Sequence, residues 1–182
     1  MARRSPWHRS AERAQLLALY AEADALVEGW SCRCTPSEDG PGGDGASAAE
    51  AAPHCCHFEV TGREPYPSAV ELEEVRHAIA RRPARRRDVS DPRLQLLRAC
   101  PLLSGDGRCT IYASRPLGCR TFFCSGARAP FGARPEPPRA ALRTIAQRIA
   151  DLSARFAPND PHPRPLVRAL AGQGRTQHVH RR

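Results

Sequence analysis

Eight cysteines are the residues of this 182-residue chain whose type and spacing predict chemistry. They stand at Cys32, Cys34, Cys55, Cys56, Cys100, Cys109, Cys119 and Cys124. Each lies at a predicted turn or element end, and none lies on an apolar helical face. Thiolates are soft ligands that suit zinc and iron–sulfur clusters. The pattern therefore predicts metal binding with all eight thiols as candidate ligands, in one site or in two.

A disulfide framework is the alternative use of an even number of cysteines. The N-terminus argues against it, because the basic pair Arg3 and Arg4 is not followed by the uncharged apolar stretch of an export signal. No apolar run approaches the roughly 18–20 residues that span a bilayer. We therefore expect a cytoplasmic protein without membrane association, in a compartment that keeps thiols reduced.

Two histidines and two arginines stand close to the cysteines in sequence. His54 and His57 flank the adjacent pair Cys55–Cys56, and imidazole ligates zinc and some iron–sulfur centres, so both are possible alternative ligands. Arg115 and Arg120 lie near Cys119, and a site with several thiolates is stabilised by nearby positive donors. We predict that both arginines support the ligands by hydrogen bonding. The alternative for Arg115 is a carboxylate or backbone carbonyl partner that holds the turn.

The composition excludes some functions and leaves one alternative open. All 28 basic side chains are Arg, which excludes lysine Schiff bases, Ser–Lys catalysis and P-loop phosphate binding. The formal net charge of +9 suits a zinc module that binds nucleic acid. Arg is spread over all segments, however, which counts against nucleic acid as a partner without excluding it.

Three amphipathic helices are predicted to position the cysteine segments. They cover residues 10–28, 68–82 and 138–156. Ser10 is a plausible N-cap for the first helix. Ser68 and Glu71 form the S-x-x-E pattern of a capping box at the start of the second. Apolar residues recur at helical spacing in all three segments.

The most structured-looking cysteine segment is predicted to be a short β-hairpin. Ser104–Gly107 has turn chemistry, and Arg108–Tyr112 alternates as a short strand does. The hairpin would carry Cys100 near one end and Cys109 just after the turn. We therefore expect a small α+β fold, rich in helix, in which helices surround this hairpin and the cysteine-bearing turns.

Changes in composition suggest how the chain is divided. Residues 1–29 are predicted to be an N-terminal helix, and 30–126 a metal-binding domain with a flexible insertion at 35–53. Residues 127–157 carry a C-terminal helix. Residues 158–182 are rich in Pro, Arg and His and are predicted to form a loose tail.

The second half of the cysteine segment resembles a known family. Cys100 opens C-P-L-L and Cys109 opens C-T-I-Y, followed by R-P and by Cys119 in C-R-x-x-x-C. This pattern is similar to that of the YkgJ-type cysteine-cluster family, the CxxCxxCC or zinc- or iron-chelating domain. The resemblance covers about residues 30–124. The family's compact N-terminal C-x2-C-x2-C-C is split here, so that Cys32 and Cys34 would stand for its first two cysteines.

The resemblance implies a small cytosolic bacterial protein that chelates an iron–sulfur cluster, of the 4Fe-4S type, or zinc. The metal would have a redox, sensory or structural role, with an unidentified protein or redox partner. A flagellin lysine N-methylase is similar in its cysteine region, which implies a component or relative of a protein methylation system as an alternative. Neither the residues nor the resemblance decides whether the chain is an enzyme or identifies catalytic residues.

Overall fold

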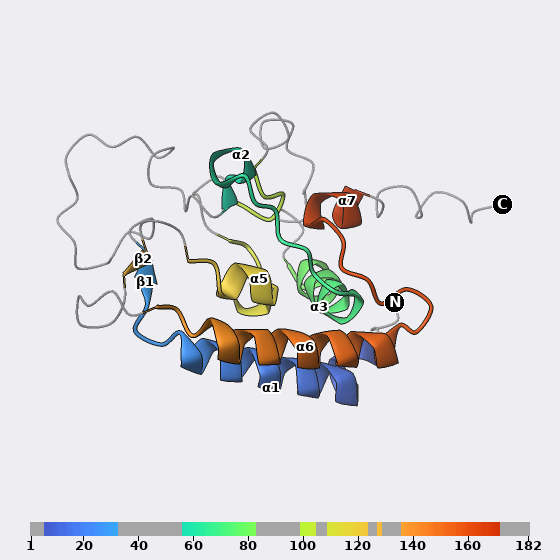
Figure 1. Cartoon of the computed structure of the whole chain (residues 1–182). Helices are drawn as coiled ribbons and strands as arrows, with labels where there is room; N and C mark the ends of the chain where they lie inside the picture. The colour runs from blue at the N-terminus through green and yellow to red at the C-terminus, as the bar shows by residue number, and fades with distance from the viewer. Residues whose placement is uncertain are drawn as a thin grey trace.

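The computed structural model describes residues 6–32, 56–82, 99–104, 109–123, 127–128 and 136–171. Helices dominate this part of the chain (Figure 1). In chain order the elements are η1 (Pro6–Arg9), α1 (Ala11–Leu26), β1 (Ser31–Cys32), α2 (Phe58–Thr61), α3 (Ala69–Ala80), η4 (Tyr112–Ser114), α5 (Leu117–Arg120), β2 (Ala127–Arg128), α6 (Arg139–Phe156) and α7 (Leu166–Ala171).

The two longest helices, α1 and α6, lie side by side and antiparallel (Figure 1). Arg148 of α6 pairs with Glu22 of α1. About two turns later on α6, Arg155 donates to Gln15, which lies about two turns earlier on α1. Their apolar faces meet in what we call the long-helix core. Its buried residues are Trp7, Leu16, Leu19, Tyr20, Ala23, Val70, Leu117, Leu142, Ile145, Ile149 and Leu152.

The three predicted helices are confirmed, and their ends follow from local chemistry. The side chain of Ser10 accepts a hydrogen bond from the backbone amide of Arg13 at the start of α1. Beyond the other end of that helix, Gly29 has a φ of 78°, a left-handed conformation that glycine adopts without steric cost. Glu71 accepts from the amide and hydroxyl of Ser68 at the start of α3.

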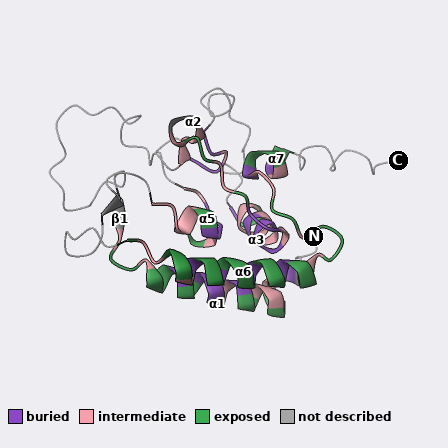
Figure 2. Cartoon of the chain, viewed as in Figure 1, coloured by how far each residue is buried: buried purple, intermediate pink, exposed green. Residues whose placement is uncertain are grey.

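A second apolar cluster lies on the other side of α3, and we call it the cysteine-side core. Its buried residues are Leu72, Val75, Cys100, Leu102, Ile111, Leu166 and Leu170. Helix α3 therefore contributes to both cores and separates them. Figure 2 shows the buried residues of α3, α5 and α6 on the faces that these helices turn toward their neighbours.

The predicted β-hairpin, and with it the α+β class, is wrong: the described fold is helix-rich. Between residues 100 and 112, only one isolated antiparallel bridge, Leu103 with Cys109, is present in the described part. The pairing stops because the chain enters η4, where the amide of Ser114 donates to the carbonyl of Ile111. Elsewhere in the described residues, the two-residue ladder of β1 with β2 and the isolated bridge of His57 with Ala99 join segments distant in sequence.

The segment after α6 differs from the loose tail expected over residues 158–182. Helix α7 packs Leu166 and Leu170 into the cysteine-side core. The amide of Leu166 also donates to the carbonyl of Pro65, and that of Arg164 to the carbonyl of Pro67. Residues 172–182 lie outside the described part. None of the described helices has both the length and the apolar character needed to cross a membrane.

Candidate metal centre

The structure describes the side chains of four of the predicted ligands: Cys56, Cys100, Cys109 and Cys119. The backbone of Cys32 is described in β1, where it lies opposite Ala127 of β2. Cys34, Cys55 and Cys124 lie outside the described residues, as does the alternative ligand His54.

Cys56 and Cys100 face each other across a short antiparallel contact. His57 and Ala99 form an isolated antiparallel bridge, and the amide of Cys100 donates to the carbonyl of Cys56 at 2.7 Å. Directly opposite residues in an antiparallel pair have Cβ atoms about 4.5–5.5 Å apart. The contact therefore brings together thiols from two distant segments of the chain.

Cys109 is connected to the same contact through a turn. The amide of Leu103 donates to the carbonyl of Cys100 at 3.0 Å, and Leu103 is bridged to Cys109. Thr110 fixes this register, because its amide and its hydroxyl both donate to the carbonyl of Leu102, at 2.9 and 2.7 Å. The turn Cys100–Leu103 and the segment after it are therefore held together by backbone hydrogen bonds.

The three cysteines share one apolar environment. Cys100 is buried in the cysteine-side core, and Cys56 and Cys109 are half-buried against it. Leu72 and Val75 of α3 and Leu166 of α7 belong to the same cluster. Surroundings that exclude water strengthen electrostatic interactions and limit solvent access to a bound metal.

After the contact between Cys56 and Cys100, the ring of His57 is a second indication that a metal is bound beside these cysteines. Its Nε2 atom is buried and has no hydrogen-bond partner among the described residues. A buried polar atom without a partner costs free energy, and metal coordination is one way in which it is satisfied. His57 follows Cys56 directly in the chain, so the prediction that it is an alternative ligand stays open and gains support.

Cys119 is positioned by a different element. It lies in α5, where its amide donates to the carbonyl of Pro116 at 2.9 Å, and its neighbour Leu117 is anchored in the long-helix core. Among the described residues, no group of three or more His, Cys, Asp or Glu side chains is arranged to hold a metal ion. A four-ligand site would need thiols from outside this part of the chain.

Arg120 is committed to backbone and side-chain partners. Its Nε donates to the carbonyl of Arg115 at 2.9 Å, one Nη to the carboxylate of Asp24 at 2.5 Å, and the other Nη to the carbonyl of Ala113. The guanidinium also lies over the ring of Tyr20, 4.2 Å from its centroid. These contacts fasten the η4–α5 turn to α1.

Arg115 is arranged differently. Its guanidinium stacks on the ring of Tyr112 at 3.8 Å. Its Nε is buried and lacks a hydrogen-bond partner within the part of the chain that the structure describes. The predicted support of metal ligands by the two arginines is not tested by these contacts, and Arg115 retains an unused donor for it.

Two glutamates one turn apart on α3 are buried, and the sequence analysis predicted neither the burial of Glu71, which it placed in the capping box, nor any role for Glu74. Glu74 is 1% exposed and accepts from Trp7 Nε1 at 2.8 Å, Arg13 Nε at 2.7 Å and Ser114 Oγ at 2.9 Å. Glu71 accepts from Tyr20 and from the amide of Leu117 in addition to Ser68. The available signal was that both acids lie among apolar positions of a helix with otherwise buried neighbours.

The pKa values of Glu74 and of Tyr20, which contacts Glu71, are shifted from their ordinary values. Burial alone would raise the pKa of Glu74, but the hydrogen bonds from Arg13, Trp7 and Ser114 outweigh it and leave that pKa lowered. Burial and the Glu71 carboxylate raise the pKa of Tyr20 well above its ordinary value. Through their hydrogen bonds the two acids connect α3 to α1, η4 and α5.

Comparison with known proteins agrees with the resemblance seen in the motifs. Residues 51–137 match the family model CxxCxxCC, described as "Putative zinc- or iron-chelating domain". The match contains six of the eight cysteines and begins after Cys32 and Cys34. Neither the curated proteins nor the solved structures that were searched gave a match.

Proposed function

We propose that this chain, in which residues 51–137 form a zinc- or iron-chelating domain of the CxxCxxCC family, binds its metal through cysteine thiolates of that segment. The observation that carries the proposal is the antiparallel contact between Cys56 and Cys100, with Cys109 joined to it by the following turn. It brings Cys56 of the adjacent cysteine pair next to Cys100 of the C-P-L-L motif, although the two residues are far apart in the sequence.

The chemistry of the described donors fits a thiolate site, although no three of them are arranged around one point without ligands from the rest of the chain. Cys100 is buried, Cys56 and Cys109 are half-buried, and the buried Nε2 of His57 has no other partner. Thiolate and imidazole are the ligands that zinc and iron–sulfur clusters share. We propose that the remaining ligands come from Cys55, Cys119 and Cys124, which the family match also contains.

Either group would supply a distinct property when bound. Four thiolates around zinc make a closed structural site, whereas a [4Fe–4S] cluster with the same ligands exchanges electrons. In both cases the site carries net negative charge, which favours a cationic donor near the sulfur atoms. We propose Arg115 for this role, because its Nε is buried and no other described group accepts its hydrogen bond.

The test is to purify the untagged full chain without oxygen and to measure zinc, iron and acid-labile sulfide together with the visible spectrum. Zinc in a fixed ratio to protein supports a structural or regulatory site. Matched iron and sulfide, with a brown colour, support a redox or sensory cluster. Metal-free protein with its thiols paired in disulfides would refute the proposal.

A further inference from the structure

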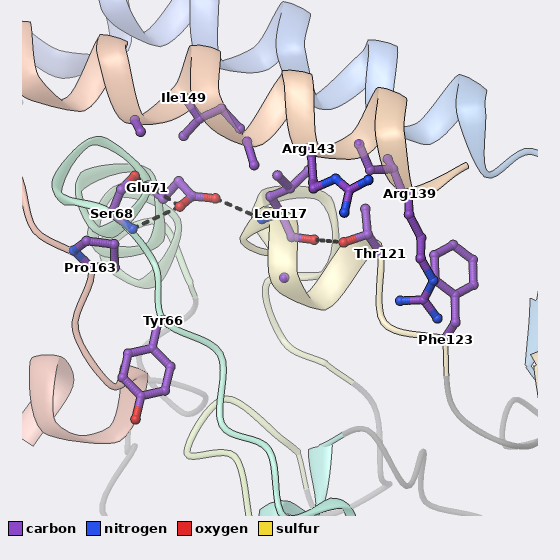
Figure 3. A pocket seen from close by; sticks show the side chains of 14 residues that line it. Tyr66, Ser68, Glu71, Leu117, Thr121, Phe123, Arg139, Arg143, Ile149 and Pro163 are labelled. Carbon is purple, nitrogen blue, oxygen red and sulfur yellow. Dashed lines mark hydrogen bonds between the residues drawn. The ribbon is translucent and has the colours of Figure 1, made fainter. Parts of the chain in front are cut away.

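A cavity of about 460 Å³ lies between α3, α5 and α6, and the proposed metal site does not account for it (Figure 3). Its size falls within the range of about 300–1,000 Å³ typical of small-molecule sites. Leu117, Leu142 and Ile149 supply apolar walls, and Tyr66, which is 60% exposed, also lines it. The cavity thus has the apolar lining that most ligand pockets share.

Two arginines from α6 supply its positive charge. Arg139 and Arg143 lie one turn apart, and Figure 3 shows both side chains extending from α6 on the same side of the cavity, with Arg139 beside the ring of Phe123. Both are exposed, and no acidic side chain of the described residues pairs with either. Guanidinium groups bind carboxylates through paired, parallel hydrogen bonds.

The position of these arginines is electrostatically unfavourable for the helix itself. α6 begins at Arg139, has no acidic residue in its first turn and has no side-chain cap at Pro138. Cations at a helix N-terminus oppose the helix dipole, and like charges one turn apart repel each other. An anion held between Arg139 and Arg143 would relieve both effects.

Glu71 does not provide that anion. It lines the cavity, but its two carboxylate oxygens accept hydrogen bonds from Ser68, Tyr20 and the amide of Leu117. Figure 3 shows Glu71 on the opposite side of Leu117 from the two arginines. The cavity therefore has a cationic end that no acidic side chain of the described residues neutralises, and a largely apolar wall next to it.

We propose that this cavity binds a small organic acid, with its carboxylate between Arg139 and Arg143 and an aromatic or aliphatic body against Phe123, Leu117 and Leu142. The apolar wall accounts for the body, and the two unpaired guanidinium groups account for the carboxylate. No cysteine lines the cavity, but Gly118 and Thr121 of its wall flank Cys119 in the chain, so the metal content of each sample is measured beside ligand binding.

The test uses 3-phenylpropionate as the probe, titrated into the full chain with its metal by calorimetry in a buffer without other organic anions. We expect saturable binding with a Kd of about 1 mM or tighter. The neutral 3-phenylpropionamide and inorganic phosphate should bind at least about tenfold more weakly, because each lacks one half of the recognised chemistry. A peptide with a C-terminal phenylalanine that binds more than about tenfold tighter than the probe would refute the small-molecule assignment.

Variants locate the binding site. Arg139→Gln combined with Arg143→Gln should weaken the binding of 3-phenylpropionate about tenfold or more. Ala146→Leu, which places a larger side chain at the cavity wall, should weaken it as well. The matched controls Arg155→Gln and Ala154→Leu lie on the same helix away from the cavity and should leave the Kd unchanged.

Three further results would overturn the proposal. The first is the absence of saturable binding of 3-phenylpropionate, and the second is a Kd that the arginine double variant leaves unchanged. The third is equal affinity for inorganic phosphate, which would mean that the arginines bind anions without using the apolar wall. The thermal stability of each variant is measured in parallel and compared with that of the wild type, so that loss of fold is distinguished from loss of binding.

Discussion

The backbone amide of Cys100 donates a 2.7 Å hydrogen bond to the carbonyl oxygen of Cys56. With the bridge of His57 to Ala99, this bond sets two cysteine motifs directly opposite each other at the edge of an apolar core. The proposed metal centre is therefore built from long-range contacts. Substitutions can distinguish residues that bind the metal from residues that only stabilise the fold.

Replacement of Cys100 by Ser should lower the ratio of bound metal to protein by at least about half, because a hydroxyl is a poor substitute for a buried thiolate ligand. The ratio is measured by elemental analysis after anaerobic purification. Leu102→Val, a change of one methylene in the same core, should retain the metal and cost about 1 kcal/mol of unfolding free energy. A fully loaded Cys100→Ser protein would contradict a ligand role.

Replacement of His57 by Gln should weaken metal affinity about tenfold, as judged by competition with a chelator. The reason is that its Nε2 is buried and has no hydrogen-bond partner. His77 offers a matched control, because its Nε2 is also buried and without a partner but lies on α3. Equal retention of metal in the His57→Gln and His77→Gln variants would show that the first imidazole is not a ligand.

The charge of Glu74 should make the protein sensitive to acid. Its pKa is lowered in the folded protein because the hydrogen bonds from Arg13, Trp7 and Ser114 outweigh the effect of burial. A lowered pKa contributes stability that is present above the unfolded value of about 4.3 and is lost as the pH falls through the folded value.

Urea unfolding of wild type and Glu74→Gln tests this contribution. The variant should be less stable by about 2 kcal/mol at pH 7, because hydrogen bonds to a charged acceptor become bonds to a neutral one. The difference should shrink as the pH falls below the unfolded value of about 4.3 and through the lower folded value, because wild-type Glu74 then becomes protonated. A difference that stays constant from pH 7 to pH 3 would exclude a charged Glu74 as its cause.

Replacement of Arg120 by Ala should destabilise the fold by about 2 kcal/mol without changing the metal ratio. The guanidinium bonds two carbonyls of the η4–α5 turn and the carboxylate of Asp24, and its side chain is 5% exposed. Denaturant unfolding and elemental analysis are measured on the same sample. A changed metal ratio at wild-type stability would instead favour a direct role of Arg120 beside the ligands.

Helix α7 should contribute to the stability of the cysteine-side core. Leu166 is 1% exposed, so Leu166→Ala should cost about 2–5 kcal/mol through lost burial and a cavity. Its neighbour Val167 is 41% exposed, and Val167→Ala should change stability by no more than about 0.5 kcal/mol. Equal stability of the two variants in denaturant unfolding would mean that α7 is not docked in solution.

Several features could be predicted from local patterns. The helices at Ala11–Leu26, Ala69–Ala80 and Arg139–Phe156 follow from apolar periodicity and from capping residues such as Ser10 and Ser68. Both signals act within a few residues, so the sequence displays them directly. The CxxCxxCC resemblance was readable for the same reason, since its motifs consist of short fixed spacings.

The hairpin and the tail could not be predicted in this way. Alternation in residues 108–112 is typical of a strand, but the chain turns into η4, where Ser114 donates to the buried Glu74 of α3. The tail composition suggests a loose segment, yet Leu166 and Leu170 fill a core whose other side is made by α3. In both places a contact with a distant element outweighs the local preference.

The sequence by itself determined which chemistry is present: thiols at turns, helices with apolar faces, and arginine as the source of positive charge. The tertiary structure alone decided that Cys56 meets Cys100 and that the side chains of Glu71 and Glu74 are buried. It also brought Arg139 and Arg143 to the edge of a cavity. The physical reason is that hydrogen bonding and burial depend on distances between segments, which the order of residues along one segment does not contain.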